Sequence, residues 1–205
     1  MSAEGLSELP GERRGAGPAV RSPLAGEAWL GFGSNLGNRL ANIERSLEHF
    51  SPFLVAVSPI FETSPWGIVE QPWFLNGVAR LSWDGSPREL LQHCLDCEQR
   101  LGRIRGRRNG PRLIDLDVLM VATTICDEPG LTLPHPGLAG RRSVLEPWSL
   151  LAPDLVIPGY DCSLSVLRER SQSFADQQLH PFSAATTTAG PSPSLCAALG
   201  PSGPG

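Results

Sequence analysis

Residues 110–120 read GPRLIDLDVLM, and the alternation of apolar and acidic residues from Ile114 to Val118 predicts an extended strand. Successive side chains of a strand point to opposite faces, so Asp115 and Asp117 project to one side and Leu116 to the other. Two neighbouring carboxylates repel each other, and burial removes the water that would stabilise them. This stretch therefore predicts a buried strand with a cation beside its acidic face.

The identity of that cation separates a functional site from a structural one. The ligand atoms on offer are all oxygens, which favours magnesium over zinc, and magnesium held by one or two carboxylates usually shares its shell with phosphates. Arg112 lies three residues upstream, so an arginine-paired structural pair of carboxylates is the alternative. The motif alone leaves both interpretations open.

The segment before this strand is rich in arginine. Six arginines and no acidic residue lie between positions 100 and 112, although the formal net charge of the chain is -4. Gly102, Gly106 and Gly110 interrupt the run and predict a loop. Positive charge confined to one loop suits a small polyphosphate better than a general nucleic-acid surface.

The chain contains no lysine, and all 17 Lys or Arg positions are arginines. This composition excludes a phosphate-binding loop of the Gly-x-x-x-x-Gly-Lys type and a Schiff-base mechanism. A guanidinium group can bind phosphate oxygens in a bidentate manner, so arginines can take that role.

Composition predicts one domain between two tails. Residues 1–26 are rich in Gly, Pro, Glu and Arg without an apolar period, which predicts a disordered extension and neither a signal peptide nor a membrane span. Residues 171–205 are rich in Ser, Ala, Thr, Pro and Gly and are also expected to be disordered. Cys94 and Cys97 lie on the apolar stripe of a predicted helix, so we expect buried thiols and a reducing cytoplasm.

Hydrophobic periodicity predicts the elements of residues 27–170. Strands are expected at 28–33, 53–61, 74–83 and 114–121. A first helix is expected from Leu40 to Phe50. A second helix is expected to begin at the capping box that starts at Ser86 and to end near Leu101. A further helix is expected near 137–151. The β-α-β-β-α-β order predicts an α+β, ferredoxin-like sandwich with a mainly antiparallel sheet and an additional C-terminal helix.

Several separated motifs resemble those of the 6-hydroxymethyl-7,8-dihydropterin pyrophosphokinase family. They are GSNLGNR at 33–39, ETSPWG at 62–67, QPWFLN at 71–76, GPRLIDLD at 110–117, LPHP at 133–136, and Arg141. The resemblance extends from about Leu30 to Pro158. It implies transfer of a pyrophosphoryl group from ATP to the hydroxymethyl group of the pterin, with release of AMP, in folate biosynthesis.

The resemblance also implies a role for each matching residue. The catalytic set would be Arg103, Arg112, Asp115 and Asp117, with the two aspartates binding two Mg2+ ions. ATP would contact Glu98, Arg105, Arg108, Val118, Thr132, His135 and Arg141. The pterin would lie against Thr63, Ser64, Trp66, Phe74 and Asn76. The partners would be these small molecules, with no nucleic acid and no membrane, and the protein is expected to be a monomer.

Two positions depart from the family pattern. Ser143 stands where the family commonly has a second aromatic residue that stacks on the pterin, and Asn109 stands where it often has tryptophan. Two other functions are alternatives. A ferredoxin-like RNA-binding module could use the Arg100–Arg112 loop, although the aromatic motifs of such modules are absent. A metal-dependent nucleotidyl or glycosyl transferase could use the Asp-x-Asp motif.

Overall fold

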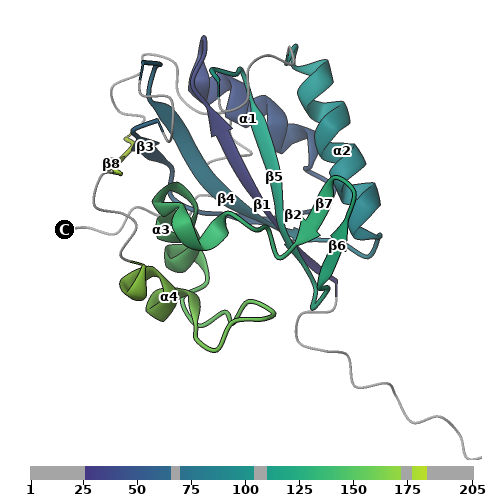
Figure 1. Ribbon diagram of the computed structural model, residues 1–205. Helices are drawn as coiled ribbons and strands as arrows, with labels where there is room; N and C mark the ends of the chain where they lie inside the picture. Colours follow the sequence, from purple (N-terminus) through teal and green to yellow (C-terminus); the bar gives the residue numbers. More distant parts are fainter. Residues whose placement is uncertain (1–25, 66–69, 104–109, 172–176, 184–205) are drawn as a thin grey trace, which may run out of the picture.

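A mainly antiparallel sheet forms the centre of the computed structural model, which describes residues 26–65, 70–103, 110–171 and 177–183 (Figure 1). Its strands are β1 (Glu27–Ser34), β2 (Leu54–Val57), β3 (Phe61–Thr63), β4 (Phe74–Ser82), β5 (Asp115–Val121) and β8 (Leu179–Pro181). The strand order is β5-β1-β4-β3-β8, and β2 also pairs with β4. A separate hairpin contains β6 (Cys126–Glu128) and β7 (Leu131–Leu133).

Four α-helices complete the α+β fold in the described ranges. They are α1 (Arg39–His49), α2 (Pro87–Arg100), α3 (Arg142–Leu151) and α4 (Leu164–Arg170), and the 3-10 helix η1 (Leu138–Gly140) precedes α3. The first two helices and the helix near 137–151 confirm the sequence-based predictions. The hairpin β6–β7 and α4 were not predicted, because each is too short to show a clear period. None of the described helices is long and apolar enough to cross a bilayer.

The predicted strand at 53–61 is divided into β2 and β3. Pro59 lies between them and has no N–H group, so it cannot continue the ladder of hydrogen bonds. Ser58 maintains the contact with β4, because its N–H donates to the carbonyl of Val78 (2.9 Å) and its Oγ accepts from the N–H of Val78 (2.9 Å). The prediction of one continuous strand is therefore wrong at this point.

The segment expected to be disordered from residue 171 contains an ordered strand. β8 pairs antiparallel with β3, in a register that places Thr63 opposite Leu179. The N–H of Phe182 also donates to the carbonyl of Ile60 (2.9 Å). Pairing with the free edge of β3 orders residues whose local composition shows no strand signal, so the expectation of disorder is wrong for residues 177–183. The parts of both expected tails at 1–25 and 184–205 lie outside the described residues.

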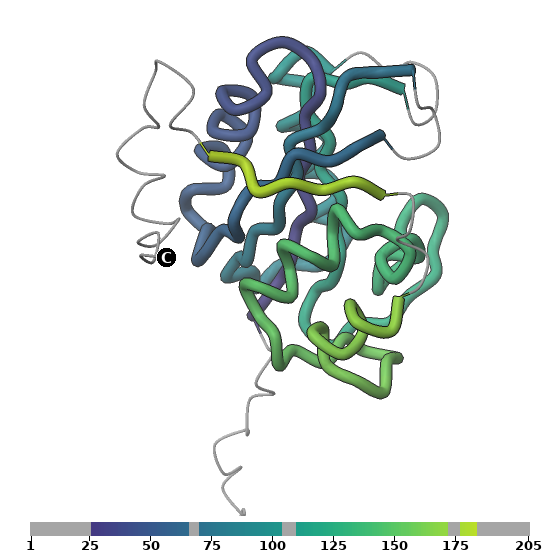
Figure 2. The backbone as a smooth tube through the Cα atoms, turned by 90° about the vertical axis from the view of Figure 1, so that its left-hand side faces the viewer, coloured from purple at the N-terminus to yellow at the C-terminus, as the bar shows by residue number. Residues whose placement is uncertain are grey.

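The two faces of the sheet have separate apolar cores. Ile114, Leu116 and Val118 pack with residues of α1 and α2, whereas Leu119 and Met120 pack with residues of α3 and α4, including the fully buried Trp148. The alternation predicted from Ile114 to Val118 is thus confirmed, whereas a register shift between β1 and β5 places both Leu119 and Met120 in the second core. Figure 2 shows the sheet between these two layers of helices. Cys94 and Cys97 are buried free thiols in the first core, as expected.

The capping box of α2 is present as predicted. The Oγ of Ser86 accepts from the N–H of Glu89 (3.3 Å), and the carboxylate of Glu89 accepts from the N–H of Ser86 (2.7 Å). The helix begins at Pro87 for this reason.

Replacing Ser86 with Ala should lower the free energy of unfolding by about 1 kcal/mol, because one N–H group of the first turn loses its acceptor. Urea unfolding followed by circular dichroism would measure the change. Ser82→Ala is the matched control, since Ser82 is exposed at the end of β4. Equal stability of the Ser86→Ala and Ser82→Ala variants would contradict this role of the cap.

Candidate active site

The acidic pair of β5 lies on the sheet face that α3 covers only in part. Asp115 is opposite Gly33 of β1, and Asp117 is opposite Gly31. Gly33 is in turn opposite Asn76 of β4. A Cβ atom on Gly33 would lie 2.4 Å from Oδ1 of Asn76, so the absence of a side chain there allows the Asn76 amide to lie across β1.

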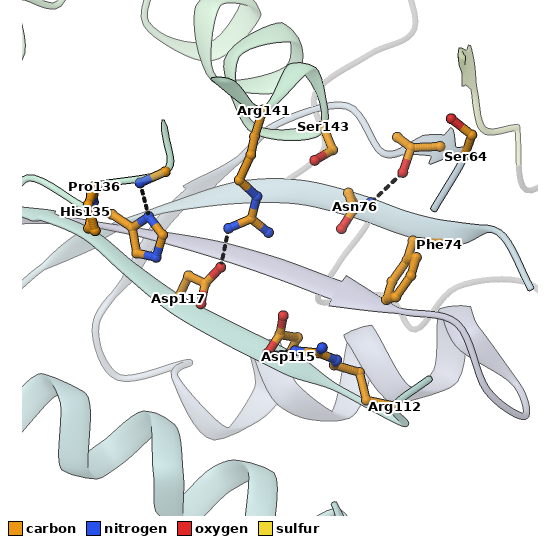
Figure 3. Close-up of a pocket in the computed structure, with 12 residues that line it drawn as sticks. Ser64, Phe74, Asn76, Arg112, Asp115, Asp117, His135, Pro136, Arg141 and Ser143 are labelled. Carbon is orange, nitrogen blue, oxygen red and sulfur yellow. Dashed lines mark hydrogen bonds and ion pairs between the residues drawn. The ribbon is translucent and has the colours of Figure 1, made fainter. Parts of the chain in front are cut away.

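Arginines neutralise both carboxylates of the pair. Oδ1 of Asp115 lies 2.8 Å from Nη1 of Arg103 and 2.8 Å from Nη1 of Arg112. Oδ2 of Asp117 lies 2.7 Å from Nη1 of Arg141 (Figure 3). The ion pair between Arg112 and the acidic pair that the sequence suggested is therefore present, and Arg103 and Arg141 also form ion pairs with these carboxylates. The second oxygen of each carboxylate accepts no hydrogen bond from any described residue.

These contacts set the charge of Asp117. Burial by itself would raise the pKa of this carboxyl, but the guanidinium of Arg141, helped by His135 and Arg112, lowers the pKa below its ordinary value. Asp117 is therefore ionised at neutral pH and can bind a cation.

Glu98 of α2 binds both the backbone of β5 and Arg103 next to the acidic pair. One of its carboxylate oxygens accepts from the N–H of Leu116 (2.8 Å) and forms an ion pair with Arg103. Burial raises the pKa of Glu98, although the bond to Leu116 and the charge of Arg103 oppose this shift. The same Nη1 of Arg103 pairs with Glu98 and with Asp115, so the nearly buried Glu98 orients Arg103 toward Asp115. Its expected contact with ATP stays a prediction.

Asn35 connects the loops around the site, a role that the sequence did not reveal. Its N–H donates to the carbonyl of Arg112 (3.2 Å), and its Oδ1 accepts from the N–H of Arg112 (2.7 Å). Its Nδ2 donates to Gln71 (3.1 Å) and to the carbonyl of Pro72 (3.0 Å). The signal was present, because two polar residues, Ser34 and Asn35, directly follow an apolar run, and both are buried.

A cavity of about 360 Å³ opens over the acidic pair (Figure 3). Its walls combine residues of β3, β4, β5 and the segment that leads into α3: Thr63, Ser64, Phe74, Asn76, Arg112, Asp115, Asp117, His135, Pro136, Gly137, Arg141 and Ser143. Nδ2 of Asn76 donates to Oγ1 of Thr63 (2.6 Å), which fixes the orientation of the amide. Four of the five expected pterin contacts thus lie together, and the fifth, Trp66, lies outside the described residues.

A second cavity, of about 270 Å³, lies on the other side of Asp117. Its lining contains Leu91, Leu116, Asp117, Val118, Gly130, Leu131, Thr132, His135 and Pro136. Three residues expected to contact ATP therefore share one cavity, namely Val118, Thr132 and His135. The unpredicted hairpin β6–β7 supplies part of its wall. Arg105 and Arg108 lie outside the described residues.

His135 stands between the two cavities in its neutral form. Its Nδ1 accepts from the N–H of Gly137 (3.1 Å), which leaves the proton on Nε2. Burial lowers the pKa of His135, and Arg141 lowers it further, whereas Asp117 and Asp115 partly oppose the shift. At neutral pH this imidazole can therefore donate one hydrogen bond from Nε2.

The fold and the site define a class of protein. Paired carboxylates with arginines, placed between two cavities, are the groups that metal-assisted transfer of a phosphoryl or pyrophosphoryl group requires. Comparison with known proteins identifies the family within this class. A sequence profile of the family described as 7,8-dihydro-6-hydroxymethylpterin-pyrophosphokinase matches residues 29–153.

Two bacterial relatives illustrate the similarity. The 2-amino-4-hydroxy-6-hydroxymethyldihydropteridine pyrophosphokinase of Methylorubrum extorquens is 42% identical over 136 residues, which cover 64% of this chain and 86% of the relative. The enzyme of the same name from Pseudomonas aeruginosa is 40% identical over 134 residues, which cover 63% and 83%. The chain therefore belongs to the 7,8-dihydro-6-hydroxymethylpterin-pyrophosphokinase family, whose members are pyrophosphokinases of folate biosynthesis.

Solved structures agree on the fold. The crystal structure of Plasmodium falciparum HPPK-DHPS superposes with a TM-score of 0.57 at 12% identity and covers 72% of this chain. The match covers 45% of that longer protein, so this chain spans less than half of its length. Family membership favours the pyrophosphokinase over the RNA-binding module and the other transferases that the sequence left open.

Replacing Gly33 with Ala should weaken binding of the pterin by about tenfold or more, because the new Cβ displaces the Asn76 amide and costs at least one hydrogen bond. Isothermal titration calorimetry would measure the change. Gly31→Ala is the matched control on the same strand face, since its Cβ would lie 3.4 Å from a flexible Leu119 methyl group. Unchanged pterin affinity of Gly33→Ala would refute the role assigned to this close approach.

Proposed function

We propose that the chain transfers the pyrophosphoryl group of ATP to the hydroxymethyl group of 6-hydroxymethyl-7,8-dihydropterin and releases AMP. The observation that carries this proposal is the pair of cavities that meet at Asp117 and His135. The smaller cavity has apolar walls from Leu116, Val118 and Leu131, which suit a nucleotide base. The larger cavity has an aromatic ring and amide and hydroxyl groups, which suit a flat polar heterocycle.

The acidic pair fits magnesium. Its donors are carboxylate oxygens, and one oxygen of each carboxylate is not engaged by the described residues. The described residues contain no cluster of three or more acidic, histidine or cysteine side chains that could hold a metal. A two-carboxylate site of this kind suits Mg2+, which completes its shell with water and phosphate oxygens. We expect two ions, as the resemblance implies.

Bound Mg2+ would neutralise charge on the phosphates and assist the attack of the hydroxyl group. The arginines then have a second role. Arg103, Arg112 and Arg141 now pair with the aspartates, and a cation at the aspartates would allow these guanidinium groups to turn toward phosphate oxygens. Neutral His135 can donate a hydrogen bond from its Nε2–H group to an oxygen of the same phosphates.

On the pterin side, two residues of β4 would bind the ring. Phe74 and Asn76 are two positions apart and line the same cavity, so the phenyl ring can stack on the pterin while the amide bonds to its polar edge. Thr63 holds the amide of Asn76 in place, and Ser64 is available at the rim. The roles of all these residues are part of the proposal.

The strand order also supports classification of the fold as a ferredoxin-like sandwich. If β2 and β3 are treated as one interrupted strand, the sheet β5-β1-β4-β3 has the order of a ferredoxin-like split β-α-β sandwich, and we propose that classification. The monomeric state and the cytoplasmic location expected from the sequence stay predictions.

A reaction with purified protein tests the function. ATP, Mg2+ and 6-hydroxymethyl-7,8-dihydropterin should yield AMP and pyrophosphorylated pterin in equal amounts, detected by chromatography. Asp117→Asn should keep the fold and lower kcat by at least about a hundredfold, because metal binding contributes several kcal/mol to the transition state. Asp84→Asn is the control, since Asp84 is exposed after β4. Full turnover by Asp117→Asn would mean that the acidic pair is structural.

Ser143 offers a second prediction, because it lines the pterin cavity from the first turn of α3. Ser143→Phe should lower the dissociation constant of the pterin by about threefold to tenfold, as an added ring can stack on the ligand. Ser143→Ala removes the hydroxyl group without adding a ring and is the control. If calorimetry gives the same constant for Ser143→Phe as for the unchanged chain, another group already covers that face.

A further inference from the structure

The C-terminal segment 177–183 lies beside the pterin cavity, although it is outside the range that the family profile matches. Figures 1 and 2 both place β8 along the edge of the sheet next to β3. The strand pairing places Thr63, a residue of the cavity wall, opposite Leu179. The segment therefore contacts the site through the wall that β3 provides.

Gln178 binds the β3 side of the cavity through its backbone. The N–H of Ser64 donates to the carbonyl of Gln178 (2.9 Å), and the N–H of Gln178 donates to Oγ of Ser64 (3.0 Å). Ser64 lines the cavity. These two bonds hold both the backbone and the hydroxyl group of Ser64, while the side chain of Gln178 is exposed.

Gln177 binds the α3 side of the same cavity through its side chain. Its Oε1 accepts from the N–H of Arg142 (2.8 Å), and its Nε2 donates to the carbonyl of Gly140 (3.0 Å). Its carbonyl also accepts from Nη1 of Arg142 (3.2 Å). Gly140 and Arg142 flank Arg141, and Ser143 follows, so Gln177 holds the turn that presents both of these cavity residues.

A third contact reaches the strand that carries the aromatic wall. The imidazole of His180 stacks on the indole of Trp73, with ring centroids 5.7 Å apart and an angle of 3° between the planes. The carbonyl of Trp73 accepts from Nη1 of Arg39 (2.8 Å). Phe74 follows directly, so the stack restrains the residue next to the proposed stacking partner of the pterin.

We propose that residues 177–183 act as a clamp that sets the width of the pterin cavity, with Gln177 as its main positioning residue. Two consecutive residues, Gln177 and Gln178, bind the two sides of the cavity, so their fixed spacing along the chain limits how far Ser64 can move from Arg141 and Ser143. The second cavity has no residue among those that the clamp contacts. The clamp contacts both sides of the pterin cavity and reaches the nucleotide only through Arg141, so it acts more strongly on the pterin than on the nucleotide, a selectivity that rests on the function proposed above.

Variants of the full chain test this inference. The pterin is titrated into protein saturated with Mg2+ and a non-hydrolysable ATP analogue, and the analogue is titrated separately. Gln177→Ala should raise the dissociation constant of the pterin about tenfold, because two side-chain hydrogen bonds to the turn are lost. The dissociation constant of the analogue should rise by less than about threefold, because the variant affects the nucleotide only through the position of Arg141. Gln178→Ala should change neither constant, since that residue acts through its backbone.

Hydrogen exchange provides a readout that needs no ligand. Gln177→Ala should speed exchange of the amide of Arg142 and also that of Ser64, whereas Gln178→Ala should affect neither amide. Gln177→Glu keeps the acceptor for the N–H of Arg142 and should restore protection at that amide, which separates the contact from a general loss of folding.

The outcomes are distinct. Equal weakening of pterin and analogue binding by Gln177→Ala, or unchanged pterin binding, would overturn the clamp. Faster exchange at Arg142 without any change at Ser64 would also overturn it, because the two sides would then be independent. Failure of the unchanged chain to bind the pterin would instead refute the proposed function, and the exchange experiment would still decide whether the two sides are coupled.

Discussion

Two carboxylates on one face of a buried strand are the constraint on which the site depends. Neighbouring carboxylates such as those of Asp115 and Asp117 repel each other, and burying them costs free energy unless positive charge lies close by. The chain meets this requirement with Arg103 after α2, Arg112 before β5 and Arg141 before α3. Three segments of the chain thus meet at the acidic pair, and Arg112 and Arg141 form part of the wall of the larger cavity.

The layers of the fold explain why this point is accessible. One face of the sheet is packed against α1 and α2, and the other is packed against α3 and α4. The latter two helices leave the acidic half of β5 and the start of β4 open, and this uncovered area is the floor of the larger cavity (Figure 3). Gly33 of β1 contributes by leaving room for the Asn76 amide.

Sequence reasoning succeeded where a local pattern carries its own physical cause. The alternation in β5 placed Leu116 in the core and the aspartates on the opposite face, and the capping box located the start of α2 at Pro87. It failed where the cause is not local. Leu179–Pro181 has no strand pattern and becomes ordered by pairing with β3, and Asn35 became a centre of hydrogen bonding only when loops around positions 72 and 112 met beside it.

The sequence by itself determined the family, the acidic pair and the order of the main strands and helices, because these depend on short motifs and on the two periodicities of strand and helix. Only the tertiary structure decided which arginine neutralises which carboxylate and that Glu98 supports Arg103. It also decided that His135 stands between two cavities and that Gln177 joins two cavity walls. Each of these depends on distances between residues far apart in the chain, which are set by packing of the helices on the sheet and not by neighbouring residues.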